Sequence, residues 1–69
     1  MRLSARNQLP GRVTDVTEGE AIANVAVDVG GQRLVASITV EAARELGLAA
    51  GTEVVLVIKA SDVMVAVDA

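Results

Sequence analysis

The sequence predicts an all-β fold with one short helix, and three patterns lead to that prediction. Apolar and polar residues alternate over residues 21–29 and again over residues 32–40, which is the period of a half-buried strand. Gly30 and Gly31 separate the two stretches and favour a tight hairpin, because both glycines tolerate positive φ. Over residues 40–47 the apolar positions are three apart, a spacing typical of one face of a short helix.

The elements in the first part of the chain follow from residue type. β-Branched residues in GRVTDVT (11–17) predict a first strand, and EGE (18–20) predicts a turn around its glycine. Thr39 is expected to cap the helix over 40–47 with its hydroxyl, and Gly47 is expected to end it. Three strands and the helix are therefore expected in the order β-β-β-α.

Two further strands are expected after the helix. A loop at 48–53 leads to VVLVIKA (54–60), whose nearly continuous apolar run predicts a strand buried on both faces. A turn at 61–62 then leads to a last strand, VMVAV, at 63–67. The order β-β-β-α-β-β is that of a five-stranded Greek-key barrel of the OB type. We therefore predict a single domain, residues 1–69, with this OB-like fold.

The composition predicts that this domain needs partners to be stable. The chain has 69 residues, no Cys, no His and no aromatic residue. A domain of this length buries only ~60% of the surface of its unfolded chain, and small apolar side chains add little area each. Without Cys, disulfides and thiolate metal sites are excluded. We therefore expect an obligate oligomer, since association is another route by which mini-domains become stable.

The same composition excludes several classes of function. The sequence has no His or Cys, no Ser in a nucleophile elbow and no phosphate-binding glycine loop, so we expect no enzymatic activity. Its scattered carboxylates indicate no metal-cation site. A net charge of −3 and the lack of aromatic residues argue against nucleic acid binding, which uses basic grooves and stacking platforms. No stretch approaches the ~20 apolar residues of a membrane span, and the N-terminus lacks a signal-peptide pattern, so a cytoplasmic protein is expected.

Hydrogen-bond donors gather in two short segments. Ser4, Arg6 and Asn7 come before the first strand, and Lys59, the only lysine, precedes Ser61 at the end of the fourth. A barrel can bring the two segments together, and a site built mainly of donors suits a small, fully ionised oxyanion, which can only accept. Each residue also has a structural interpretation. Arg6 can be a solvated arm residue, Lys59 an edge charge and Ser61 part of a simple turn.

Three stretches resemble a known family. SARNQLPGRV (4–13), ASITVEAARELGLAAGTEV (36–54) and VIKASDVMVAV (57–67) are similar to the molbindin or Mop domain, a TOBE-like domain that binds molybdate or tungstate. The resemblance covers one copy of the domain, nearly end to end. It implies an OB-like fold, a homo-hexamer built as a trimer of dimers, and oxyanion sites at subunit interfaces. The implied function is intracellular molybdenum storage or homeostasis, with molybdate or tungstate as ligand and no other cofactor.

The resemblance also implies which residues form the site. Two segments of one chain match its donors: Ser4, Ala5 and Arg6, with Asn7 beside them, and Lys59, Ala60 and Ser61. A turn from a neighbouring subunit matches at Gly19, Glu20, Ala21 and Ile22. Glu20 would repel a dianion unless its carboxylate turned outward and backbone N–H groups did the binding. Pro10 and Gly11 are expected to turn the chain from the donor-rich arm into the barrel.

Two alternative interpretations belong to other classes of protein. ITVEAARELGLAAGTEVVLVI (38–58) is also similar to the swapped-hairpin transcription factors of the AbrB type, which are small DNA-binding dimers. That resemblance covers under half of the chain, leaves SARNQLPGRV unexplained and needs a basic face. The other alternative is a structural oligomerisation module whose donors serve only contacts between subunits.

Overall fold

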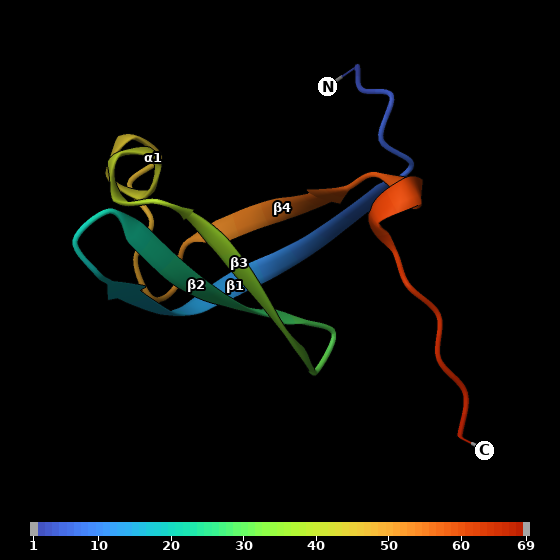
Figure 1. The fold of residues 1–69 in the computed structure, drawn as a ribbon. Helices are drawn as coiled ribbons and strands as arrows, with labels where there is room; N and C mark the ends of the chain where they lie inside the picture. The colour runs from blue at the N-terminus through green and yellow to red at the C-terminus, as the bar shows by residue number, and fades with distance from the viewer. Residues whose placement is uncertain (1, 69) are drawn as a thin grey trace.

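The computed structural model describes residues 2–68, which form one antiparallel sheet with a short helix at one end (Figure 1). Its elements are, in chain order, β1 (Asn7–Glu18), β2 (Ile22–Val29), β3 (Gln32–Thr39), α1 (Val40–Glu45), β4 (Glu53–Ile58) and the 3₁₀ turn η1 (Ala60–Asp62). The strands lie in the order β3-β2-β1-β4. Among the described residues, no helix is long and apolar enough to cross a membrane. The fold is thus mostly β and OB-like with one short helix, as the sequence predicts.

Strand β1 connects the two halves of the sheet. Its first half pairs with β4, beginning with Asn7 opposite Ile58, and its second half pairs with β2. The register with β2 shifts between Val13 and Asp15. A bulge of this kind adds local twist and bends the strand. As a result β1 pairs with both β2 and β4 as one long strand, and Figure 1 shows it running between them.

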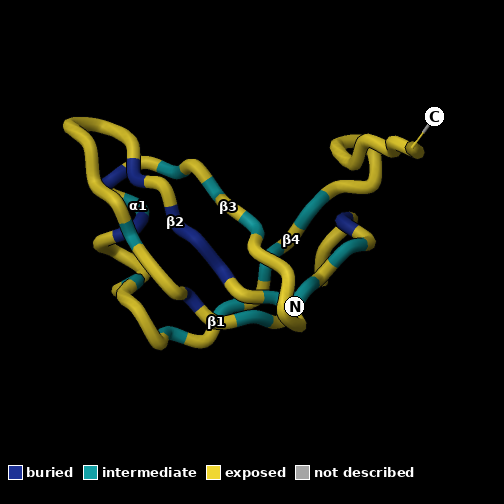
Figure 2. Tube along the Cα trace, turned by 90° about the horizontal axis from the view of Figure 1, so that it is seen from below, coloured by how far each residue is buried: buried dark blue, intermediate teal, exposed yellow. Residues whose placement is uncertain are grey.

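The core is small and is built from small side chains. Two buried clusters form it: Val13 with Val25 and Val27, and Ala23 with Val40 and Ala43. Figure 2 shows that the buried positions are concentrated in β2 and around α1. Because valine and alanine bury little apolar area each, these clusters supply limited stabilisation. Much apolar surface is therefore left in contact with water in a single chain.

Helix α1 begins as the sequence predicts and ends slightly earlier. The hydroxyl of Thr39 accepts a hydrogen bond from the backbone N–H of Ala42 at 3.0 Å, which confirms Thr39 as the N-cap. The regular helix stops at Glu45 rather than residue 47. Gly47 follows with φ of +64°, the left-handed conformation that glycine adopts most easily after a helix. The helix covers the end of the sheet next to the β1–β2 turn.

The predicted last strand, 63–67, and hence the five-stranded barrel, are wrong for the single chain. Residues 63–68 have no regular structure and run away from the sheet (Figure 1). Met64 is 94% exposed, Val65 89% and Val67 86%. A strand is held by hydrogen bonds to a neighbouring strand, and this segment pairs with no strand among residues 2–68. The sheet is therefore open, with β3 and β4 as its two edges.

The prediction that strand 54–60 is buried on both faces is also wrong. Strand β4 spans Glu53–Ile58, and along it exposed residues alternate with half-buried ones. Val55 is 45% exposed and Val57 43% exposed, because no second layer covers the outer face of the sheet in one chain. Lys59 lies just beyond the strand, immediately before η1.

Pro10 and Gly11 do not turn the chain, contrary to the prediction. Both lie within β1, paired with Val55 and Val54 of β4, because the strand begins at residue 7 rather than 11. A Cβ atom at Gly11 would lie 2.7 Å from the carbonyl oxygen of Asp28. Glycine is therefore needed because β1 and β2 approach very closely here.

Candidate functional site

The structure brings the two donor-rich segments to the same end of the molecule. Asn7 is opposite Ile58 in the β1–β4 pairing, and the amide Nδ2 of Asn7 donates to the carbonyl oxygen of Ile58 at 3.2 Å. The recorded pairing ends at this pair, so Arg6 of the N-terminal arm and Lys59 before η1 are the residues that follow it in the chain. The N-terminal arm and η1 accordingly meet at the right-hand end of the sheet in Figure 1.

These segments carry donors that their own chain does not use. Among the described residues, the backbone N–H groups of Ala60 and Ser61 donate to no backbone carbonyl, and η1 has no side-chain cap. Ala5 is buried, whereas Ser4 and Ser61 are exposed with no side-chain hydrogen bond to another described residue. An exposed set of unused donors can bind an acceptor from solution. Asn7 differs, because its amide already donates to Ile58 and so acts in joining the segments.

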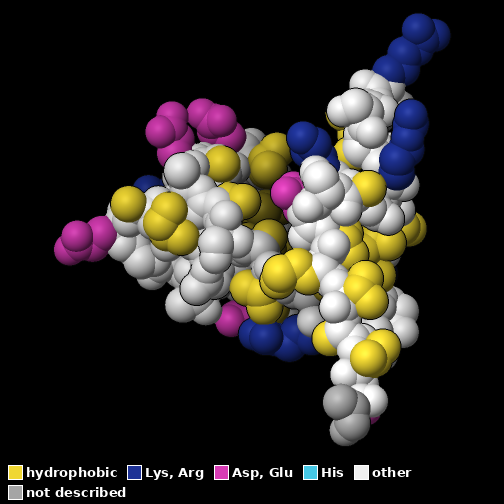
Figure 3. Space-filling view, turned by 45° about the vertical axis from the view of Figure 1, so that its right-hand side comes forward, with side chains coloured by type: hydrophobic (Ala, Val, Ile, Leu, Met, Phe, Trp, Pro, Cys, Tyr) yellow, Lys and Arg dark blue, Asp and Glu magenta, His cyan; other side chains and the backbone are white. Residues whose placement is uncertain are grey.

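Two positive charges at this end have no acidic partner. Within residues 2–68, the ion pairs join Arg12 to Glu53 and Arg44 to Glu18, and neither Arg6 nor Lys59 takes part in one. Figure 3 shows Lys or Arg side chains along the projecting arm and several acidic side chains on the opposite side of the view. An anion bound between the two segments would be attracted by both charges, which have no acidic partner of their own in residues 2–68.

The predicted third segment, Gly19–Ile22, lies at the other end of the sheet. It forms the turn between β1 and β2, at the far side of Figure 1 from η1. The N–H of Gly19 donates to the carbonyl of Ile22 at 2.8 Å, while the N–H groups of Glu20 and Ala21 have no backbone acceptor among the described residues. One chain therefore does not bring this turn to the other two segments.

Two contacts that sequence reasoning missed fix the position of this turn. Arg44 Nη2 of α1 lies 2.8 Å from Glu18 Oε2 at the end of β1, and this hydrogen bond, with the attraction of the two charges, raises the pKa of Arg44. The N–H of Val40 donates to the carbonyl of Ala21 at 2.8 Å. The partners of both contacts are far apart in sequence and follow no local pattern, so no signal in the sequence could have paired them.

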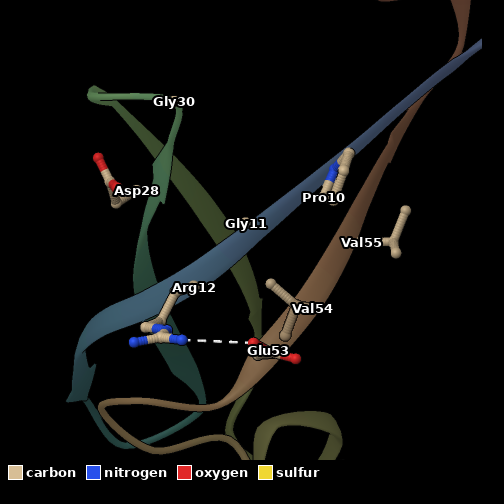
Figure 4. A pocket seen from close by; sticks show the side chains of 8 residues that line it. All are labelled: Pro10, Gly11, Arg12, Asp28, Gly30, Glu53, Val54 and Val55. Atoms are coloured by element: carbon tan, nitrogen blue, oxygen red, sulfur yellow. Dashed lines mark hydrogen bonds and ion pairs between the residues drawn. The ribbon is translucent and has the colours of Figure 1, made fainter.

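One hollow in the described structure lies away from these segments. Figure 4 shows it between β1, β4 and the β2–β3 turn, and its lining is Pro10, Gly11, Arg12, Asp28, Gly30, Glu53, Val54 and Val55. The guanidinium of Arg12 is already paired with Glu53 Oε1 at 3.3 Å. Asp28 adds a second carboxylate, so this hollow is unsuited to a dianion. No group of three or more His, Cys, Asp or Glu residues in the described chain could hold a metal ion.

Comparison with proteins of known sequence identifies relatives of matching length. The TOBE domain family matches residues 3–65. A probable molybdenum-pterin-binding protein from Haemophilus influenzae is 42% identical over 99% of this chain and 100% of its own. Molybdenum-pterin-binding protein 3 from Clostridium pasteurianum is 41% identical over 94% of this chain and 97% of its own.

Solved structures give the same result. A molybdate-binding protein from Sporomusa ovata superposes with a TM-score of 0.92 at 33% identity, covering 96% of this chain and 98% of that one. The cytoplasmic molybdate-binding protein ModG, solved with molybdate bound, superposes with a TM-score of 0.85 at 49% identity, covering 87% of this chain and 43% of that one. The chain therefore belongs to the TOBE domain family, among its molybdenum-pterin-binding or Mop members.

Proposed function

We propose that this protein binds molybdate, and tungstate by the same chemistry, for molybdenum storage or homeostasis in the cytoplasm. The observation that carries the proposal is the pairing of Asn7 with Ile58, which brings the segments that carry Arg6 and Lys59 to the same end of the sheet, where neither side chain has an acidic partner among the described residues. The names of its relatives and the molybdate in the solved ModG structure support the choice of ligand. That ModG is described as cytoplasmic supports the location.

The chemistry of the donors fits a tetrahedral dianion. Molybdate offers only acceptor oxygens at neutral pH, and the two segments offer hydroxyl, guanidinium, ammonium and backbone N–H donors. Hydrogen phosphate would bring a donor that this site leaves without an acceptor, at a cost of ~1–3 kcal/mol. Sulfate has the same charge as molybdate, so discrimination against it must come from the size of the space between the segments.

The site is completed by a second chain. The free N–H groups of Glu20 and Ala21 lie too far from η1 to join it within one chain, because they belong to the opposite end of the sheet. In an oligomer the turn of one subunit can meet the arm and η1 of another. The carboxylate of Glu20 then turns away from the anion, and the backbone supplies the donors.

The apolar tail supports assembly. Residues 63–67 leave the sheet highly exposed, and Figure 3 shows apolar side chains along the tail and on the adjacent body. The described structure has an apolar cavity lined by residues of β2, β3, β4 and the segment after α1: Val25, Val27, Ala36, Ile38, Leu46, Leu48, Val54, Val55 and Leu56. The tail of the chain runs away from its own sheet (Figures 1 and 2). We infer that it enters the cavity of a second copy, as the fifth strand, in a dimer that builds a hexamer.

The remaining alternatives fit less well. The described residues contain the donor set but no nucleophile–base pair, so a binding role without catalysis is proposed for residues 1–69 as one domain. An AbrB-like DNA-binding role would need a basic face on a chain of net charge −3. A purely structural oligomerisation module would leave Arg6 and Lys59 as unneutralised charges.

Titration calorimetry on the purified protein tests the proposal. Sodium molybdate and tungstate are expected to give saturable binding, with sulfate and phosphate much weaker at the same ionic strength. Light scattering on the same sample is expected to report a hexamer. Saturable zinc or calcium binding without a response to molybdate would contradict the proposal, and so would a salt-dependent shift of DNA.

A further inference from the structure

The turn that carries half of the proposed anion site is also the only link between the sheet and the tail. Strand β4 ends at Ile58, η1 spans Ala60–Asp62, and the tail begins at Val63. The N–H of Asp62 donates to the carbonyl of Lys59 at 2.9 Å, and the N–H of Val63 donates to Ala60 at 3.2 Å. The conformation of this turn therefore sets the direction in which the tail leaves the sheet.

The chain itself holds this turn weakly. All three residues of η1 are exposed, none of its side chains caps it, and the two backbone hydrogen bonds named above are its described supports. A segment with few buried contacts and solvent-exposed hydrogen bonds opens locally far more often than the whole fold unfolds. In the free protein, η1 thus acts as a loose hinge.

We propose that the oxyanion locks this hinge and so holds the tail in the second copy. The proposal rests on the proposed function, because it needs the anion to bind at Lys59–Ser61. The N–H groups of Ala60 and Ser61 point to no backbone acceptor, so an anion that accepts from them adds contacts that exist only while the turn is formed. Opening the hinge then requires the anion to leave first.

The size of the effect follows from linkage. A ligand that binds only the closed state reduces the population of the open state by the factor 1 + [L]/Kd. At an anion concentration of 100 times Kd, the tail is expected to open about 100-fold less often. Because coupling is reciprocal, a chain with an unconstrained hinge also binds the anion more weakly. Anion occupancy therefore controls how long the tail of one subunit stays inserted in the second copy.

Hydrogen exchange measured by mass spectrometry on the full-length oligomer tests the lock. The tail, residues 63–67, is compared with the middle of β2, residues 25–27, which contributes to the buried core. Exchange is followed without anion and with sodium molybdate at 100 times the Kd measured by calorimetry. Sodium sulfate at the same concentration controls for ionic strength. The tail amides are expected to slow about 100-fold, or down to the rate of β2 if that limit is reached first.

Lys59→Met provides the matched variant, and Arg33→Met is its control. Lys59→Met removes the ammonium and is expected to reduce the molybdate effect on the tail at the same anion concentration from about 100-fold to about tenfold or less. Arg33 lies on strand β3, outside the segments of the proposed site, and takes part in no ion pair among the described residues, so Arg33→Met is expected to behave as the wild type.

The outcomes separate the lock from the binding proposal. Calorimetric saturation with unchanged tail exchange would overturn the lock while leaving molybdate binding intact. Equal slowing of the tail and β2 would also overturn it, because the anion would then stabilise the whole oligomer without acting on a local hinge. If calorimetry detected no binding of molybdate, the proposed function would be contradicted, and the lock with it.

Discussion

The side-chain amide of Asn7 donates to the backbone carbonyl of Ile58 at 3.2 Å, across 51 positions of sequence. This contact closes the end of the β1–β4 pairing, immediately beside the arm and η1. It joins two segments that would otherwise be free chain ends. Asn7 therefore acts on the geometry of the proposed anion site indirectly, because its amide binds the backbone of Ile58 and so holds the two segments together.

Asn7→Ala is expected to weaken both the fold and the site. Losing a partly buried hydrogen bond should lower the free energy of unfolding by about 0.5–1.5 kcal/mol. Molybdate affinity should fall as well, since Arg6 and Lys59 are then less firmly held together. Chemical denaturation and calorimetry measure the two effects. Gln8→Ala, on an exposed position of the same strand, is the control and should change neither quantity.

Lys59→Met is expected to reduce molybdate affinity at least tenfold while the oligomer persists. Truncating one partner of a hydrogen-bonded charge pair at an interface typically costs ~2–5 kcal/mol, and methionine retains the apolar stem. Arg33→Met removes a charge of the same sign from a solvated strand and should bind as the wild type does. Wild-type affinity in the Lys59 variant would make the lysine only an edge charge.

Glu20→Gln is expected to strengthen binding. If the β1–β2 turn of a neighbouring subunit completes the site, removing its carboxylate charge reduces repulsion of the dianion. The gain should reach at most about fivefold at low salt and shrink as salt is added. Asp28→Asn removes an equal charge at the hollow of Figure 4, away from this turn, and should leave affinity unchanged. Equal responses of the two variants would show that only net charge matters.

Val65→Asp is expected to disrupt assembly. Val65 is 89% exposed in one chain, so a charge there costs little unless the tail is buried in a second copy. Sedimentation should report smaller species for this variant at micromolar concentration. Ala50→Asp, in an exposed loop, is the control. An intact hexamer in the Val65 variant would place the tail outside every subunit interface.

Much of the fold follows from local sequence patterns. The alternation in β2 and β3, the glycine pair between them and the cap at Thr39 are each set within a few residues, and the structure confirms them. The expected turn at Pro10 and Gly11 failed for a reason that is not local. Only the close approach of β1 to the carbonyl of Asp28 explains why glycine occupies a strand.

The barrel and the site depend on long-range contacts that a single chain supplies only in part. The apolar run in β4 and the tail have the composition of buried strands, yet Val57 and Val65 face water here. In the proposed assembly these side chains would be buried, whereas one chain shows only its own contacts. The donor segments were predictable as a pair because the strand order sets them side by side. The Arg44–Glu18 contact, which positions the third segment, was not predictable from the sequence.

A crystal structure of the protein soaked in sodium molybdate, with the anomalous signal of molybdenum recorded, tests the central claim most directly. The molybdenum peak is expected where Lys59 and the backbone of Ser61 from one chain meet the Glu20–Ala21 backbone of another. Donor-to-oxygen distances should be about 2.7–2.9 Å for the charged donor. A peak in the hollow beside Arg12, a site formed by one chain alone, or no peak despite saturation in solution would contradict the account.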